Sequence, residues 1–551
     1  MSGRKIFLAF GWFACAAFWS AAVGAQYPPS TSAQHSHSAS SENAGAEKLG
    51  TVSFPTSCSA GAQNEFQKAV ALLHSFQYSQ AAKAFESAAA KDPHCAIAHW
   101  GMAMARWHAL WEQPDGPTRE KGWADVEKAQ SLGAKTPRER DYISAAAALY
   151  RDPAKSDYAA RAGVYSKAME QVHQKYPDDG EAAAFYALSL LALPAPDPAA
   201  DLADRKKAVA ILQKLLTENP DHPGAAHYLI HACDTPPLAA QGLDAARRYA
   251  RIAPSSAHAL HMPSHIFARL GLWQESIDSN LASAAAAKEA TLQHLEDAGY
   301  QIHAMDFLEY AYLQSGREAD ARRVIEDVAS VPGSTPNELA YTKGEFEARV
   351  AIELHRWQDA RSLEVPVGAP RGSRETILWA RTVGAARASD AAAAPKNLEE
   401  LRKVQTEWRA ENPNAAPATV AAEQIYERKS EAWMIFAEGR KDDAAKFLRE
   451  TAEQEDSTRP ELMGVPAREM LGDMMLELGR PAEALAAYQA SLKEAPNRFN
   501  SLYGAGHAAE LASQPADART YYAQLLAVSD HAPPGRPELQ HAKLFLEEKA
   551  R

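Results

Sequence analysis

Histidine is concentrated in one stretch of this chain. Eight of the 19 histidines lie between residues 222 and 303, where an even spread along 551 residues would put about three. Two pairs have the form H-x-x-x-H, His227 with His231 and His261 with His265. Residues four apart share one face of a helix, one turn from each other. Because neutral imidazole is the commonest metal ligand and suits zinc, copper and iron, the pairs predict a site for a divalent transition metal.

The residues between the paired histidines exclude one zinc mechanism. They are YLI at 228–230 and MPS at 262–264, so neither pair has the glutamate that an H-E-x-x-H peptidase uses as its general base. The sequence also lacks a C-x-x-C-H haem motif, a glycine-rich phosphate loop and a G-x-S-x-G nucleophile elbow. Asp306, Glu309 and Tyr310 are the nearby candidates for a general base, and their spacing matches no catalytic motif. The sequence therefore favours binding over catalysis and leaves enzyme activity open.

Histidines on a helix face also suit roles without a metal. They can hydrogen-bond an anionic peptide or another polar ligand, or they can cap backbone carbonyls. The proline of the HMPSH segment, residues 261–265, can distort its helix enough to turn the two rings apart. Metal binding, polar-ligand binding and a structural role are therefore all retained as interpretations of the histidines.

The chain as a whole is acidic and globular in composition. It has 70 Asp and Glu residues against 58 Lys and Arg residues, and 46% of it is hydrophobic. Nucleic acid and anionic lipid attract a net positive surface, so we expect no nucleic-acid partner. A chain of 551 residues is too long for one ordinary core, so it should contain several domains or stacked repeats.

The first residues have the pattern of an export signal. Arg4 and Lys5 precede an uncharged apolar run, residues 6–23, which ends in the small residues that signal peptidase recognises. This predicts a signal peptide at residues 1–25, although an uncleaved membrane anchor would contain a similar run. Residues 26–50 are rich in Ser, Ala and His and are expected to form a flexible leader. We expect the mature protein to be exported, either periplasmic or secreted, without a stable membrane span.

From Glu65 onward the chain has the composition of α-helix, and it contains internal repeats. A pattern of two small residues and an aromatic recurs after 34 residues near the C-terminus, as Gly472, Ala484, Tyr488 and then Gly506, Ala518, Tyr522. Related patterns lie at Ala81, Phe85, Ala88, Pro93 and at Ala208, Leu212, Leu215, Pro220. Small residues let two antiparallel helices approach, and the aromatic fills the space between repeats.

On these residues the chain resembles the tetratricopeptide-repeat (TPR) superfamily over most of residues 62–530. The resemblance implies an all-α, right-handed superhelical solenoid of TPR-like helix-turn-helix repeats, in which each hairpin is covered by the next. It implies an N-terminal and central array at 51–365, a degenerate helical linker region at 366–430 and a C-terminal array at 431–551. The segments HCAIAHWGMAMA and HALHMPSHIFARLG further resemble a group of exported bacterial repeat proteins. The fold serves many unrelated roles, so it does not identify the function.

The cysteines are interpreted in the light of export. Three of them remain after signal cleavage, and thiols outside the cytoplasm tend to be oxidised. We predict a disulfide between Cys58 and Cys95, because Cys95 ends the first repeat and Cys58 lies just before it, while sequence alone leaves other pairings open. Cys233, near the histidines, is then a buried small residue or a metal ligand.

The register of the TPR superfamily implies which side chains line the concave surface, namely those at positions two, five, nine, twelve and thirteen of each first helix. Counting from Pro220 and from Gly271 puts both histidine pairs at positions five and nine. The adjoining repeats add His258, His303, Asp306 and Tyr310 to the same surface, with Arg269 at position thirteen and Asp234 three residues after His231. The predicted metal ligands are His227, His231, His258, His261, His265, His303 and Asp306, and Arg269 and Tyr310 are predicted groove residues.

The C-terminal repeats carry a different groove chemistry. Glu469, Asp473 and Glu477 fall at positions five, nine and thirteen, which predicts an acidic concave surface. Such a surface suits a basic peptide or protein partner, unless the charges simply face water.

Two functions follow from these observations. The first is an exported TPR scaffold that binds a protein, a peptide or a small polar ligand in its concave groove. The alternative is a metal-binding protein, or a metal-dependent enzyme, that uses the central histidines. The identity of the ligand, the metal and the oligomeric state are open at this point.

Overall fold

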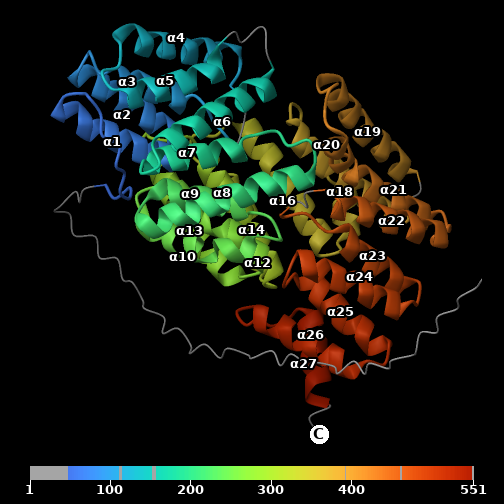
Figure 1. The fold of residues 1–551 in the computed structure, drawn as a ribbon. Helices are drawn as coiled ribbons and strands as arrows, with labels where there is room; N and C mark the ends of the chain where they lie inside the picture. The colour runs from blue at the N-terminus through green and yellow to red at the C-terminus, as the bar shows by residue number, and fades with distance from the viewer. Residues whose placement is uncertain (1–46, 111–113, 152–156, 391, 459–461, 549–551) are drawn as a thin grey trace, which may run out of the picture. The chain divides into compact units, whose positions relative to one another are not determined.

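Consecutive helices pack against each other in hairpins along the chain (Figure 1). The computed structural model describes residues 47–110, 114–151, 157–390, 392–458 and 462–548, and no strand occurs among them. The predicted signal peptide, residues 1–25, and most of the predicted leader, residues 26–50, lie outside the described residues. The expected all-α solenoid of TPR-like repeats is confirmed.

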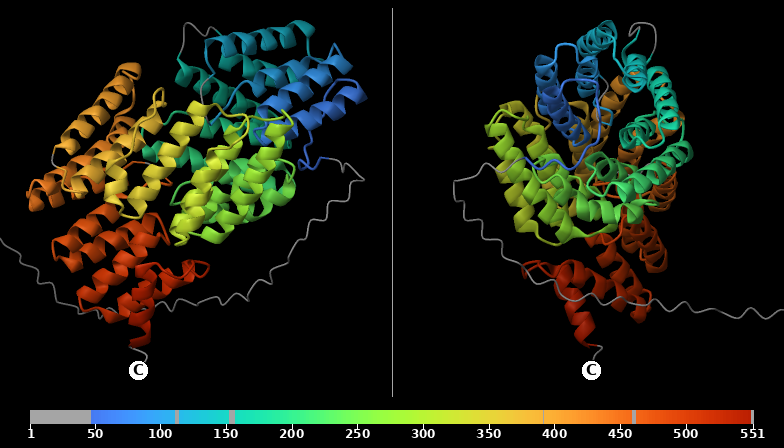
Figure 2. Two further views of the ribbon diagram at one scale, coloured as in Figure 1. Left: turned by 180° about the vertical axis from the view of Figure 1, so that it is seen from behind. Right: turned by 60° about the vertical axis from the view of Figure 1, so that its left-hand side comes forward.

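The first helices enclose an apolar core that runs from Leu49 to Phe267. They are α1 (Ala60–His74), α2 (Tyr78–Lys91), α3 (Ala96–Ala105), α4 (Gly116–Leu132), α5 (Pro137–Tyr150), α6 (Tyr158–Lys175), α7 (Gly180–Leu191), α8 (Pro198–Glu218), α9 (Pro223–Cys233), the 3-10 helix η1 (Ala239–Gly242), α10 (Leu243–Ile252), α11 (Ala257–His261) and α12 (Pro263–Leu270). Figure 2 shows the same helices from two further directions, with α1 and α2 side by side as one hairpin.

Two further cores follow along the chain. The second runs from Ala268 to Val350 and is built mainly by α13 (Trp273–Leu292), α14 (Gly299–Gln314), α15 (Glu318–Val328) and α16 (Pro336–Glu353). The third runs from Ala348 to Phe545 and includes α17 (Trp357–Arg361), α18 (Arg371–Arg387), α19 (Ala393–Glu411), α20 (Pro417–Glu423), α21 (Ile425–Ala437), α22 (Lys441–Asp456), α23 (Ala467–Glu477), α24 (Pro481–Glu494), α25 (Phe499–Leu511), α26 (Pro515–Val528) and α27 (Pro537–Glu548). Residues 366–430, predicted as a linker region, contribute buried side chains to this third core, among them Ile377 and Leu401.

The repeat pattern of the sequence has a direct steric cause in the C-terminal hairpins. The ring of Tyr488 lies between Gly472 on α23 and Gly504 on α25, and a β-carbon at either glycine would come within 2.6 Å or 2.3 Å of that ring. Gly506 stands in the same relation to Tyr522, at 2.5 Å. Glycine is therefore needed where an aromatic ring packs directly against the backbone of a neighbouring helix.

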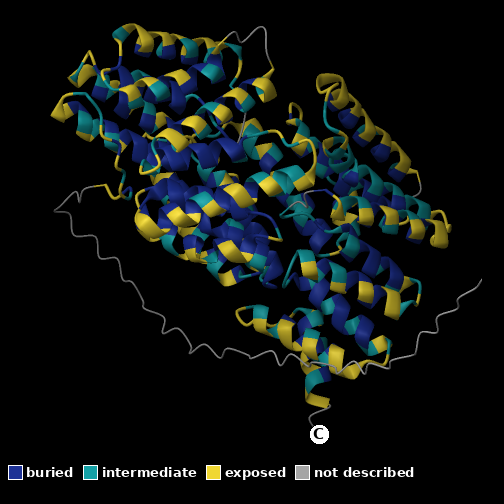
Figure 3. Cartoon of the chain, in the orientation of Figure 1, coloured by how far each residue is buried: buried dark blue, intermediate teal, exposed yellow. Residues whose placement is uncertain are grey.

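Burial follows the hairpin arrangement. Figure 3 shows that α9 and α14 are largely buried, whereas α19 and α26 expose one side to solvent. The central helices, which carry the histidines, are thus covered by neighbours on several sides. Among the described residues, no helix combines the length and the apolar composition that a bilayer crossing requires.

The predicted disulfide is present. Cys58, just before α1, is bonded to Cys95, the residue just before α3, with the two Cα atoms 5.0 Å apart. The bond closes the first hairpin and holds the extended segment from residue 49 to 58 against it. Cys233 is a free, buried thiol, and burial raises its pKa to about 12.

We expect the Cys58→Ser/Cys95→Ser variant to lose about 3 kcal/mol of unfolding free energy, because the disulfide spans 37 residues and restricts the unfolded chain. Guanidinium denaturation followed by circular dichroism measures the change. A reducing agent should lower the stability of the wild-type protein to the same value and leave the variant unchanged. Equal stability of the oxidised wild type and the variant would contradict a stabilising disulfide.

Candidate metal centre

Six imidazole rings from four helices meet in the central part of the chain. Helix α9 contributes His227 and His231, and α11 contributes His258 and His261. His265 comes from α12 and His303 from α14. Helix α9 starts at Pro223, where a proline costs no backbone hydrogen bond, and His222 caps it by accepting from the N–H of Ala225.

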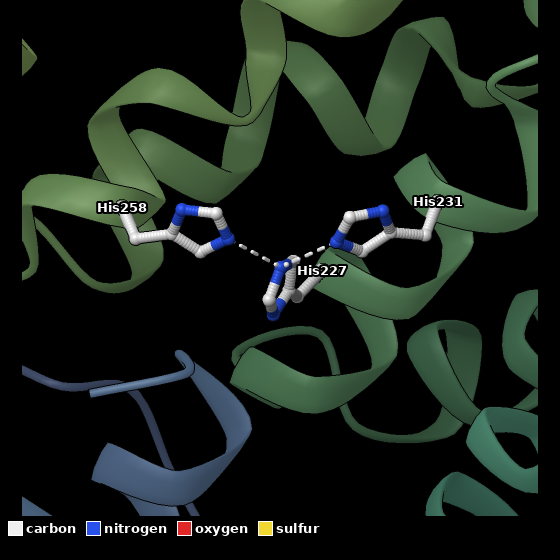
Figure 4. Close-up of side chains that lie close together, drawn as sticks. All are labelled: His227, His231 and His258. Atoms are coloured by element: carbon white, nitrogen blue, oxygen red, sulfur yellow. Dashed lines mark hydrogen bonds between the residues drawn. The ribbon is translucent and has the colours of Figure 1, made fainter. Parts of the chain in front are cut away.

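The first three rings form a group that we call triad A: His227, His231 and His258. The Nε2 atom of His227 lies 3.1 Å from Nε2 of His258 and 3.1 Å from Nε2 of His231 (Figure 4). One potential ligand atom from each residue lies within 4.8 Å of the others. Two metal–nitrogen bonds of about 2.0–2.1 Å place the nitrogens about 3–3.4 Å apart, so the spacing fits ligands of one ion.

The other three rings, His261, His265 and His303, form triad B. The Nε2 atoms of His261 and His265 lie 3.0 Å apart, and a ligand atom of His303 completes a group within 4.8 Å. Pro263 does interrupt the helix, since α11 ends at His261 and α12 begins at Pro263. The break leaves the two rings together, with their centres 5.0 Å apart.

Hydrogen bonds fix the tautomers of three of these rings. The Nδ1–H of His227 donates to the backbone carbonyl of His74 at 2.6 Å, and a carbonyl can only accept. His261 donates from Nδ1 to Oδ1 of Asn280 at 2.7 Å, and the amide of Asn280 is oriented by its bond to Ser276 O. His265 donates from Nδ1 to Asp234 at 3.0 Å. A neutral ring that carries its proton on Nδ1 presents a lone pair at Nε2, which is the arrangement of a metal-bound histidine.

This arrangement brings lone pairs face to face. When both His261 and His265 are neutral, their Nε2 atoms have no proton to share, although they lie 3.0 Å apart. Two such nitrogens repel unless a cation lies between them, either a proton on one ring or a metal ion bound to both. A protonated ring at His261 is costly, because that side chain is only 1% exposed.

The environment disfavours the charged form of these imidazoles. Burial, helped by repulsion among neighbouring rings, lowers the pKa of His227 to about 3 and that of His303 to about 4. The same causes hold the pKa values of His231, His258 and His261 well below their usual range. These five imidazoles therefore favour the neutral form that coordinates a metal.

Two phenylalanines that the sequence analysis missed support the rings. Phe76 packs on triad A, with its ring centre 4.4 Å from that of His227, and Phe307 packs on triad B, 4.7 Å from His261 and 4.6 Å from His265. Phe76 adopts a positive φ of 55°, a conformation that costs a bulky residue about 1–2 kcal/mol. This left-handed turn ends α1, as similar turns end other helices of the chain, and it places the Phe76 ring against the histidines.

A cavity of about 460 Å³ lies beside both triads. One wall is formed by His231 and His258 of triad A, His265 and His303 of triad B, together with Asp234 and Arg205. The remaining wall is mainly apolar and comes from two loops, at Ala109 and Leu110 and at residues 191–194, with Tyr158 beside them. A small molecule in this cavity would contact imidazoles of both triads.

Two residues predicted for this site have other partners. Asp306 was predicted as a ligand, but its carboxylate pairs with Arg349 of α16 at 2.7 Å and does not lie within either triad. Arg269 was predicted for the groove, and its Nε donates to Asp234 at 2.9 Å. Asp234 thereby orients both His265 and Arg269.

The predicted acidic groove of the C-terminal repeats is not an open acidic surface. Glu469 is 1% exposed and accepts two hydrogen bonds from Arg498, and Tyr310, predicted for the groove, is also buried against Arg498. Asp473 accepts from the hydroxyl of Tyr488, and Glu477 pairs with Arg387. Partners from other helices neutralise or cover each of the three carboxylates, a fact that the pattern along α23 cannot reveal.

Two other groups of potential ligands have simpler explanations. The first group, His74, Glu181 and His222, is buried. The Glu181 carboxylate lies 2.7 Å from Nε2 of His74 and 3.3 Å from Nε2 of His222. Nδ1 of His74 is bonded to the hydroxyl of Tyr228, and Nδ1 of His222 accepts from the N–H of Ala225. The His74 ring therefore hydrogen-bonds Glu181, whereas Nε2 of His222 faces the same carboxylate without forming a hydrogen bond. The second group, His507, Glu510 and His541, is partly exposed, and Nε2 of His541 forms a hydrogen bond of 2.8 Å with the carboxylate of Glu510.

Comparisons with known proteins add little to this geometry. No family model and no curated protein matches the chain. Among solved structures, the human IFIT1 dimer with PPP-AAAA is similar over 79% of this chain and 90% of its own, with a TM-score of 0.37 and 12% identity. The yeast Tom70 crystal structure is similar over 82% of this chain and 95% of its own, with a TM-score of 0.31 and 12% identity.

We expect Asp234→Asn to weaken metal binding at triad B about 10- to 100-fold, because an amide orients His265 less well than a carboxylate and removes a negative charge near the ion. Competition with a chromophoric chelator measures the affinity. The exposed Asp442→Asn variant is the control, and triad A should keep its affinity in both variants. An unchanged affinity at triad B would show that Asp234 does not support a ligand.

Proposed function

We propose that this protein is a metal-binding helical-repeat protein, in which triads A and B each hold one transition-metal ion. The observation that carries the proposal is the pair of His261 and His265, whose Nε2 lone pairs face each other at 3.0 Å while both Nδ1 atoms donate elsewhere. A metal ion between them satisfies both nitrogens without the buried charge that a protonated His261 would carry. Triad A also brings three Nε2 atoms together, with Nε2 of His227 at 3.1 Å from those of His231 and His258.

The ligands define which metals suit the site. Each triad offers three imidazoles, and a further coordination position toward the cavity would let a small ligand or substrate bind. Zinc, copper and iron all accept imidazole nitrogen. A carboxylate ligand, which non-haem iron oxygenases require beside two histidines, is missing from both triads.

We further propose that the protein works outside the cytoplasm. The apolar N-terminal run supports export, and the Cys58–Cys95 disulfide supports an oxidising compartment, where such bonds persist. Metal binding at the triads does not depend on this location.

Binding of a small polar ligand without a metal is the second candidate. It is favoured by Arg205, which lines the same cavity as the imidazoles and whose guanidinium is held by Asp201 and the carbonyl of His231. A TPR-like scaffold that binds partners in this way needs no ion at the triads. The two candidates differ in one measurable quantity, the metal content of the protein.

Equilibrium dialysis of the chelator-stripped full chain against zinc and copper tests the proposal. We expect two tightly bound ions per chain and an increase in thermal stability on binding. The His94→Ala/His531→Ala variant, which removes two exposed histidines, should also bind two ions. Failure of the wild-type chain to retain any ion would reject metal binding and leave the metal-free polar ligand as the function.

A further inference from the structure

The two triads lie close enough to act as one centre. Across the boundary between them, the ring centres of His231 and His265 are 6.0 Å apart and those of His258 and His261 are 5.9 Å apart. Within triad A, by comparison, His231 and His258 are 6.4 Å apart. The six rings therefore form one continuous cluster, and ions bound to the two triads would be close neighbours.

The cluster contains no anionic ligand to offset the charge of two ions. The nearest carboxylate, Asp234, is held by the guanidinium of Arg269 and by Nδ1 of His265, and Asp306 is paired with Arg349. Two dications at the same separation repel each other about four times as strongly as two monocations. A pair of ions in this neutral, buried site is thus favoured in a monovalent state, or when an anion bridges it.

Copper is the metal that meets this requirement. Imidazole nitrogen binds copper well, and copper is the first-row metal that proteins hold as a monovalent ion. Three imidazoles without a carboxylate or thiolate give each cuprous ion a neutral set of ligands. The shared cavity is lined by imidazoles from each triad, so a small ligand in it would lie beside ions held at both triads.

Building on the metal-binding function above, we propose that triads A and B form a dinuclear copper centre that binds dioxygen between the two ions. Each cuprous ion gives up one electron, so that two Cu(I) become two Cu(II). Dioxygen accepts both electrons and becomes a bridging peroxide, with its O–O bond retained and no proton consumed. The reverse electron transfer releases dioxygen and restores both cuprous ions.

The surroundings fit this chemistry. The peroxide dianion supplies the bridging negative charge that the neutral ligands lack, so the divalent pair is stabilised only while the anion is bound. Phe76 and Phe307 pack against rings of triads A and B, which adds apolar surface around the centre. Burial of His227 and His261, at 0% and 1% exposure, keeps the centre in a low-dielectric environment in which such charge compensation is strong.

The test uses the chelator-stripped full chain, loaded with Cu(I) under anaerobic conditions. We expect two cuprous ions per chain and, on admission of air, the uptake of one dioxygen for every two copper ions. A near-ultraviolet charge-transfer band should appear with the uptake and disappear when the dioxygen is removed under argon. The exposed-histidine variant His94→Ala/His531→Ala should behave like the wild type.

A variant that keeps only one triad separates dinuclear from mononuclear chemistry. His261→Ala/His265→Ala should bind one cuprous ion and show neither the band nor the stoichiometric uptake. If the wild-type chain binds two copper ions and takes up no dioxygen, or if each single-triad variant takes up as much dioxygen per copper as the wild type, the dinuclear centre is rejected while metal binding stands. If no ion binds at all, the metal-binding function is rejected as well.

Discussion

His227→Ala/His231→Ala is expected to reduce the metal content of the chain from two ions to one, and His261→Ala/His265→Ala should have the same effect at the other triad. Each double substitution leaves a single imidazole in its triad, and one neutral nitrogen does not hold an ion against a competing chelator. The combined fourfold variant should retain no ion. Elemental analysis after gel filtration measures all three variants.

Matched controls separate loss of ligands from loss of fold. His94 and His531 are exposed, so replacing both removes the same number of histidines without touching the cluster. Circular dichroism should show the same helix content for every variant. Retention of two ions by either cluster variant would contradict the assignment of three ligands to each triad, and loss of both ions from one double variant would show that the triads do not bind independently.

Arg498→Met is expected to lower the free energy of unfolding by about 3–5 kcal/mol, because it leaves buried carboxylates without their partner. The guanidinium of Arg498 is 0% exposed and binds Glu469 through two nitrogens, at 2.9 Å and 2.8 Å. It also donates to Glu353 at 2.9 Å and to the hydroxyl of Tyr310 at 2.8 Å. These contacts join α14, α16 and α23 to the N-terminus of α25.

The charge state of this network decides the size of the effect. Burial raises the pKa of Glu353, whereas the attraction of Arg498 overcomes burial and lowers the pKa of Glu469. Without the arginine, at least one carboxylate must be either ionised and unpaired or protonated in the core. Adding Glu353→Gln and Glu469→Gln to Arg498→Met should therefore restore part of the lost stability.

Guanidinium denaturation measures these variants. Arg480→Met, which removes a partly exposed arginine from the loop before α24, is the control and should leave the midpoint nearly unchanged. A midpoint for Arg498→Met equal to that of the control would contradict a stabilising role for the buried contacts of Arg498. Failure of the glutamine substitutions to recover stability would show that packing of the arginine, and not its charge, dominates.

Features that recur at a fixed spacing along the chain could be predicted from the sequence. The 34-residue spacing of Gly472 and Gly506 predicted the hairpins, because each glycine admits an aromatic ring from a neighbouring helix. The same spacing placed His227 and His261 in equivalent positions, and the structure brings their pairs together. Periodicity predicts such features well, since they depend on the position of a residue within its own hairpin.

Contacts between distant segments could not be predicted in this way. The carbonyl of His74, which orients His227, lies 153 residues away along the chain, and Phe76 belongs to the same turn. Asp306 and Glu469 occupy repeat positions that predicted side chains facing the groove. Arg349 binds the first and Arg498 binds the second, and both arginines come from other helices. A register assigns a side chain to a face, but the partners of that side chain depend on the packing of other repeats.

The most direct test of the two-ion centre is anomalous diffraction from crystals of the metal-loaded full chain, collected at the absorption edge of the bound metal. We predict two peaks in the anomalous map, each about 2.0–2.1 Å from Nε2 atoms of its triad, one at His227, His231 and His258 and the other at His261, His265 and His303. Both peaks should border the cavity beside His231 and His265. Density only at other positions, such as His507 and His541, with none among the six central rings, would contradict the account.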